Sequence, residues 1–175
     1  DMTAAELSFV RRLSRVVDRF HNPPPLQPIV RQALTDVTDF YKGLVRYLDT
    51  EHPDWQPLSL KNRFRVLERY LKDAEATPDL GDLLRYQWLL HGLPPRDPLG
   101  GARRVTALPA DGVEVRAGAY DLGNPIPGYC QVWQAVLWGR PHWFVYRPAQ
   151  RRRATAVLTP PDLPFQGRDG TVQEW

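Results

Sequence analysis

The stretch QVWQAVLWGRPHWFVYRPAQRRRATAVL, residues 131–158, decides the fold class. Its apolar, aromatic and β-branched residues follow the two-residue period of half-buried strands. The segments Gln131–Trp138 and Trp143–Arg147 flank GRPH, which has the length and composition of a four-residue hairpin loop. A third segment, Arg153–Leu158, follows the turn PAQRR. The stretch therefore predicts three antiparallel strands.

The expected register sorts the side chains of these strands into two faces. We pair Trp138 with Trp143 across the first turn and Arg147 with Arg153 across the second. One face is then apolar and is expected to pack on the core; it carries Trp133, Ala135, Leu137, Phe144, Tyr146, Ala154, Ala156 and Leu158. The opposite face carries Gln134, Val136, Trp138, Trp143, Val145, Arg147, Arg153, Thr155 and Val157.

The second face is the candidate binding surface. Aromatic rings flanked by arginines bind single-stranded nucleic acid, because the rings stack on bases and the guanidinium groups neutralise phosphates. The same combination occurs at the hot spots of protein interfaces. A structural interpretation also stands, in which Leu163, Phe165 and Trp175 of the tail cover the face. A slip of one residue in register would exchange the two faces.

The first ninety or so residues predict helices. Thr3 and Glu6 have the spacing of a capping box at the start of the first helix. The prolines of NPPPLQP, residues 22–28, end that helix, because proline cannot continue it. One apolar face of this helix is expected to hold Val10, Leu13, Val17 and Phe20.

Three further helices are expected before residue 93. The second runs from about Pro28 to Leu48, and the third begins after Ser59, which can cap it. The fourth begins at Thr77, since Pro78 suits the first helical position, and Gly92 can stop it at its C-terminal end. Four helices with short connections predict a small bundle.

The composition changes at LPPRDPLGG, residues 93–101. We therefore expect a helical subdomain over residues 1–93, a Pro/Gly linker over 94–101, and a β subdomain over 102–175 with an irregular tail. Val113–Ala119 is a further candidate strand. The predicted class is α+β, with about four N-terminal helices followed by a small antiparallel sheet of three to four strands.

The bulk composition favours a soluble protein of the cytoplasm. The chain has 175 residues and a formal net charge of +3, and no apolar run reaches the length of a membrane span. We find no signal peptide, and the single cysteine, Cys130, excludes an intramolecular disulfide. All but three of the 23 basic residues are arginine, which suits bidentate contacts with phosphate as well as a bias of codon usage.

Two helices carry basic stripes that can follow a phosphate backbone or form an ordinary solvated face. Arg11, Arg15 and Arg19 make the first stripe, and the second comprises Lys61, Arg65, Arg69 and Lys72. We expect a nucleic-acid site in which Trp138 and Trp143 stack on bases. Its expected phosphate contacts are Arg147, Arg151, Arg152 and Arg153, with Lys61, Arg65 and Arg69 from the helix.

Catalytic signals are weak. The four histidines show no metal-ligand spacing with each other or with Cys130, and the sequence has no P-loop and no G-x-S-x-G motif. We expect no cofactor and no metal. The predicted function is a non-enzymatic nucleic-acid-binding module. The alternative is a protein-interaction or assembly module, including a homo-oligomer, that uses the same aromatic face.

Overall fold

The structure is a computed structural model that describes residues 2–34, 36–52, 58–74, 77–108, 114–118, 129–147 and 153–159. Within these residues, five α-helices precede a five-stranded antiparallel sheet, so the α+β prediction is confirmed. The helices are α1 (Ala4–Val16), α2 (Gln27–Ala33), α3 (Val37–Glu51), α4 (Leu60–Asp73) and α5 (Pro78–Leu90). A π-helical turn, η1 (Val17–His21), extends α1.

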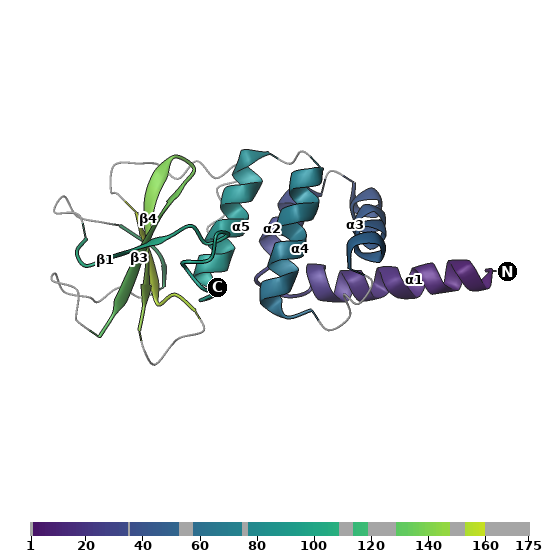
Figure 1. The fold of residues 1–175 in the computed structure, drawn as a ribbon, viewed down its shortest axis with the longest axis horizontal. Coiled ribbons are helices and arrows are strands. Elements are labelled where there is room, and N and C mark those ends of the chain that lie inside the picture. Colours follow the sequence, from purple (N-terminus) through teal and green to yellow (C-terminus); the bar gives the residue numbers. More distant parts are fainter. Residues whose placement is uncertain are drawn as a thin grey trace.

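The predicted capping box at the start of α1 is confirmed. The Thr3 hydroxyl accepts the Glu6 N–H at 3.2 Å, and the Glu6 carboxylate accepts the Thr3 N–H at 2.6 Å. The predicted apolar face is right for Phe20, which is fully buried, but wrong for Val10, which is 47% exposed. Val10 is exposed because the N-terminal half of α1 projects past the other helices (Figure 1).

The single helix expected from Pro28 to Leu48 is wrong. The chain forms two helices there, and Leu34 has an extended backbone at the break. Asp36 accepts the Asp39 N–H at 2.9 Å and so caps a new helix. A side chain that satisfies a backbone donor in this way competes with continuation of the preceding helix.

The starts and stops of the last two helices follow the sequence more closely. Ser59 caps α4 by accepting the Asn62 N–H at 3.3 Å, as predicted. α5 begins at Pro78, directly after Thr77, although the Thr77 side chain makes no capping hydrogen bond. Gly92 follows the end of α5 with a φ of +66°, the left-handed conformation that glycine adopts without strain.

The strands are β1 (Arg103–Val105), β2 (Glu114–Gly118), β3 (Gln131–Leu137), β4 (Arg140–Tyr146) and β5 (Ala156–Thr159), in the spatial order β1-β3-β4-β5-β2. β1 was not predicted, because three residues are too few to show a period. It lies at an edge of the sheet beside β3.

The predicted pairing of Trp138 with Trp143 is wrong. Leu137 pairs with Arg140, so the loop has two residues, and Trp143 pairs with Gln134. Both loop residues have positive φ, +50° at Trp138 and +72° at Gly139, as in the tight turns that match strand twist. The displacement from the predicted pairing is even, so β3 and β4 keep the predicted assignment of their strand residues to faces.

The third predicted strand is displaced by one residue, and its faces are exchanged. Phe144 pairs with Val157 and Trp143 pairs with Leu158, so Val157 lies on the helix side. The expected pair of Arg147 with Arg153 does not form, because β5 begins only at Ala156. The segment before β5 forms a hydrogen bond to a helix: the Ala154 N–H donates to the Leu90 carbonyl at the end of α5 at 2.8 Å.

α5 packs against β3 and joins the helices to the sheet (Figure 1). One hydrophobic core spans both parts: it contains the fully buried Trp88 of α5 together with Leu137, Phe144 and Val157 of the sheet. The division at residues 94–101 into separate subdomains stays a prediction. No helix in the described ranges is long and apolar enough to cross a membrane.

Candidate nucleic-acid interface

The two tryptophans of the predicted site lie on opposite sides of the sheet. Trp143 is 4% exposed and packs in a second apolar cluster with Val132 and Leu158, on the face turned away from the helices. Trp138 leaves the strand at the turn and packs with Tyr86 of α5, on the helix side. The predicted shared aromatic face is therefore wrong, since it required Trp138 to continue the alternation of β3.

Trp138 connects the hairpin to α5. Its backbone N–H donates to the Asp82 carboxylate at 2.6 Å, and its ring centroid is 5.8 Å from that of Tyr86. Arg85 donates to both the Asp82 carboxylate and the Val136 carbonyl, each at 3.3 Å. A tryptophan rarely adopts positive φ, and these contacts offset the strain. These contacts within the chain are sufficient to explain the position of Trp138.

Of the predicted arginines after the hairpin, the structure describes Arg147 and Arg153. Arg147 is half-buried, and its backbone N–H donates to the Thr155 hydroxyl. Arg153 is exposed near the end of α5, where burial and then this positive charge lower the pKa of His91 to about 4. Arg151 and Arg152 lie outside the described residues.

Lys61 and Arg65 of the predicted helix stripe share a carboxylate. Both contact the same oxygen of Asp97, Lys61 at 3.1 Å and Arg65 at 2.8 Å, and the Leu99 N–H donates to the other oxygen at 3.3 Å. Burial raises the pKa of Asp97, but hydrogen bonds from Lys61, the Leu99 N–H and Arg65 outweigh it and hold the pKa below its usual value. Arg69, further along α4, is exposed.

Arg96, directly before Asp97, lies on a tryptophan of the sheet. Its guanidinium carbon is 5.4 Å from the ring centroid of Trp133, which is a cation–π arrangement. The Trp133 side chain is nearly buried at 7% exposure, whereas Arg96 is exposed. The guanidinium group therefore packs on the indole and is still open to a ligand.

A second arginine lies opposite the same tryptophan on the edge strand. Arg104 pairs with Trp133 across β1 and β3, so both side chains stand on one face at neighbouring positions. Its neighbour Arg103 lies on the other face and donates through Nε to the Gln134 side chain at 2.9 Å. No carboxylate in the described part of the chain forms an ion pair with Arg96 or Arg104.

We name the residues joined by these contacts and by this strand pairing the basic edge. It runs from α4 through the loop after α5 to the edge strand β1, and it consists of Lys61, Arg65, Arg96, Asp97, Arg104 and Trp133. Four cations stand against one carboxylate, which is only 8% exposed. Such a surface attracts polyanions and offers planar donors that fit phosphate oxygens.

The sequence reasoning found Lys61 and Arg65 and missed the other cations of the basic edge. Arg96 lies in a segment interpreted as a linker, and Arg104 precedes any strand that periodicity could detect. The available signal was the run RRV after GGA, in which adjacent arginines meet a β-branched residue. The sequence does not indicate that Trp133, which we assigned to the core, forms a cation–π contact with Arg96.

Metal chemistry finds no support in this part of the chain. Among the residues whose positions are described, no group of three or more His, Cys, Asp or Glu side chains is arranged to hold a metal ion. Comparisons with protein-family models, with curated proteins and with solved structures found no match.

Proposed function

We propose that this chain is a non-enzymatic nucleic-acid-binding module and that the basic edge is its binding surface. The observation that supports this most is that Arg96 packs on Trp133 while the edge strand places Arg104 opposite the same tryptophan. Two guanidinium groups at neighbouring positions repel each other unless an anion lies between them. A phosphate diester supplies that anion, and a guanidinium group can bind it through two parallel hydrogen bonds.

The surrounding residues favour a polyanion over a single anion. Lys61 and Arg65 extend the positive surface onto α4, and Asp97 holds both of them in place. Cations in a row can contact successive phosphates of one strand. Because their side chains are partly ordered before binding, less conformational entropy is lost when the ligand binds.

The basic edge replaces the predicted pair of tryptophans as the centre of the proposal. Trp143 is buried and Trp138 packs on α5, so neither is offered as a stacking residue. Phosphate contacts by Arg151, Arg152 and Arg153 stay a prediction. A location in the cytoplasm also stays a prediction.

A titration with a labelled oligonucleotide at low and high salt tests this proposal. With about four phosphate contacts, the affinity for a single strand should fall roughly 50-fold between 50 and 200 mM salt, because bound counterions are released. Absence of binding at low salt, where electrostatic attraction is strongest, would exclude nucleic acid. If the affinity does not change with salt concentration, the basic edge is excluded as the binding surface.

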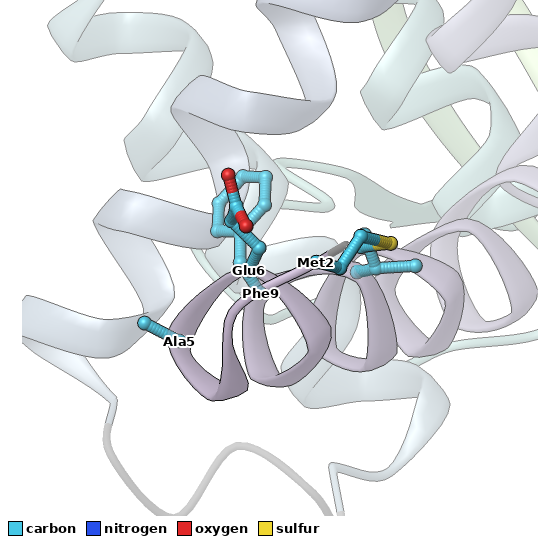
Figure 2. Close-up of a pocket in the computed structure, with 5 residues that line it drawn as sticks. Met2, Ala5, Glu6 and Phe9 are labelled. Carbon is cyan, nitrogen blue, oxygen red and sulfur yellow. The ribbon is translucent and has the colours of Figure 1, made fainter.

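A different observation supports the alternative, an assembly module. Met2, which precedes α1, is 53% exposed, and Leu7 and Val10 of α1 are 45% and 47% exposed. Figure 2 shows part of an open cavity of about 450 Å³ along this end of α1, lined by Met2, Ala5, Glu6, Phe9 and Val10. Exposed apolar clusters of this kind can mark contacts with another chain. If copies associate through α1, the measured mass rises with concentration, and Val10→Glu returns it to that of the monomer.

A further inference from the structure

An exposed aromatic ring lies just before the strand that carries Trp133. Tyr129 precedes β3 by two residues and is 61% exposed, the highest value among the large hydrophobic side chains that the structure describes. Its neighbour Cys130 is buried with Val132 on the face turned away from the helices. Tyr129 lies in the turn that leads into β3 and is not part of that cluster, so its ring is open to solvent.

The distance between these groups suits an extended ligand. Tyr129 and Trp133 are four residues apart, so their Cα atoms lie no more than about 14 Å from each other. Gln131, also exposed, lies between them. A strand of nucleic acid that places phosphates at the arginines can therefore place a nearby base at Tyr129.

The aromatic ring distinguishes single strands from duplexes. The bases of a duplex are stacked on each other, and their flat faces are not free to meet a protein side chain. An unpaired base can stack on a tyrosine, and every base has such a face, so this contact tolerates many sequences. Tyrosine also provides a rigid ring whose hydroxyl group stays in water.

We propose that the basic edge selects single-stranded nucleic acid, with Tyr129 stacking on a base while Arg96 and Arg104 bind the adjacent phosphates. This inference rests on the proposed function and deepens it. Arg96 and Arg104 supply affinity for any nucleic acid, and Tyr129 supplies the preference for an unpaired strand. Trp133 packs beneath Arg96 and does not contact the base.

The test measures the affinities of one oligonucleotide sequence, single-stranded and as a duplex, for the unchanged chain, Tyr129→Ala and Tyr129→Phe. The single strand should bind more tightly than the duplex. Tyr129→Ala should lower affinity for the single strand about 5- to 100-fold and leave the duplex unchanged. Tyr129→Phe should stay within about threefold of the unchanged chain, since phenylalanine keeps the ring.

Two results overturn the inference while leaving the proposed function intact. One is equal, salt-dependent affinity for single strand and duplex. The other is a Tyr129→Ala chain that binds the single strand as tightly as the unchanged chain. Failure of both ligands to bind at low salt would instead overturn the proposed function, and this inference with it. Thermal melting of each variant checks that the fold is kept, as expected for an exposed position.

Discussion

The guanidinium carbon of Arg96 lies 5.4 Å from the ring centroid of Trp133, and the edge strand places Arg104 opposite the same tryptophan. At an exposed site, a cation–π contact contributes about 0.5–1 kcal/mol, which offsets part of the roughly 2 kcal/mol of rotamer entropy that an ordered arginine side chain loses. The arrangement joins two cations that would repel each other if the surface bound nothing. This geometry is the basis of the proposed nucleic-acid interface.

Asp97→Asn should strengthen binding of nucleic acid and weaken the fold. The change removes the one carboxylate of the basic edge and leaves Lys61 and Arg65 free for phosphates. We expect affinity to rise several-fold and the free energy of unfolding to fall by roughly 1 kcal/mol, since both cations are partly exposed and screened. Oligonucleotide titration and urea unfolding measure the two effects. Asp79→Asn, the same change at an exposed site on α5, should leave both nearly unchanged; equal effects of the two variants would refute this role of Asp97.

Asp82→Ala should destabilise the junction between α5 and the hairpin. The carboxylate accepts the Trp138 N–H, and its loss leaves that donor partly buried without this acceptor. We expect the free energy of unfolding to fall by about 1–3 kcal/mol. Asp79→Ala, one turn earlier on the same helix, should cost no more than about 1 kcal/mol through the helix dipole. Urea unfolding compares the two variants. An equal loss of unfolding free energy in both would contradict the role of the Asp82–Trp138 hydrogen bond.

His91 should make the fold sensitive to moderate acid. Burial and the charge of Arg153 lower its pKa to about 4 in the folded chain, whereas an unfolded chain titrates near pH 6.5. Between these values the unfolded chain binds more protons, so the free energy of unfolding falls as pH drops from about 6.5 to 4. The slope from this group is at most about 1.4 kcal/mol per pH unit.

The contribution of His91 can be separated from that of Asp97. His91→Gln should flatten the pH dependence of urea unfolding between pH 6.5 and 4. Asp97, whose pKa is lowered, stabilises the fold above its usual value near 4, and this contribution is lost as pH falls below that value. Unchanged slopes above pH 4 in His91→Gln would show that this histidine is not buried in the neutral form.

Two glycines in helices should respond oppositely to alanine. A Cβ atom at Gly43 would collide with the Tyr70 hydroxyl, which donates to the Phe40 carbonyl at 3.1 Å. Gly43→Ala should therefore cost about 1–3 kcal/mol. At Gly81 no atom lies within 4 Å of an added Cβ, so Gly81→Ala should stabilise the chain by about 0.5–1 kcal/mol. Thermal melting should show shifts of opposite sign, and shifts of the same sign would contradict the packing of Gly43 against Tyr70.

Local chemistry made much of the fold predictable. The Thr3–Glu6 capping box, the Ser59 cap and the start of α5 at Pro78 depend on residues within one helical turn, and all three are where the sequence placed them. The register of β5 failed because it depends on a distant contact. The bond from Ala154 to Leu90 fixes the segment before the strand, and no local pattern shows it.

The candidate site was less predictable than the fold. Its helix cations, Lys61 and Arg65, appear as a stripe in the sequence, but their shared partner Asp97 lies 32 residues beyond Arg65. The arginines around Trp133 come from a proline-rich loop and a three-residue strand. Long-range packing alone brings them together. Trp138 was misplaced for a related reason: a two-residue turn took it out of the strand.

Charge reversal of the two arginines tests the central claim most directly. Arg96→Glu with Arg104→Glu should be compared with Arg31→Glu and Arg46→Glu, which make the same change in net charge at exposed positions of α2 and α3. The account predicts that the first pair lowers affinity for a single-stranded oligonucleotide at least tenfold and reduces the salt slope by about 1.4, while the control pair has a much smaller effect. Equal losses in both double variants would show that only net charge matters and would contradict the assignment of the basic edge.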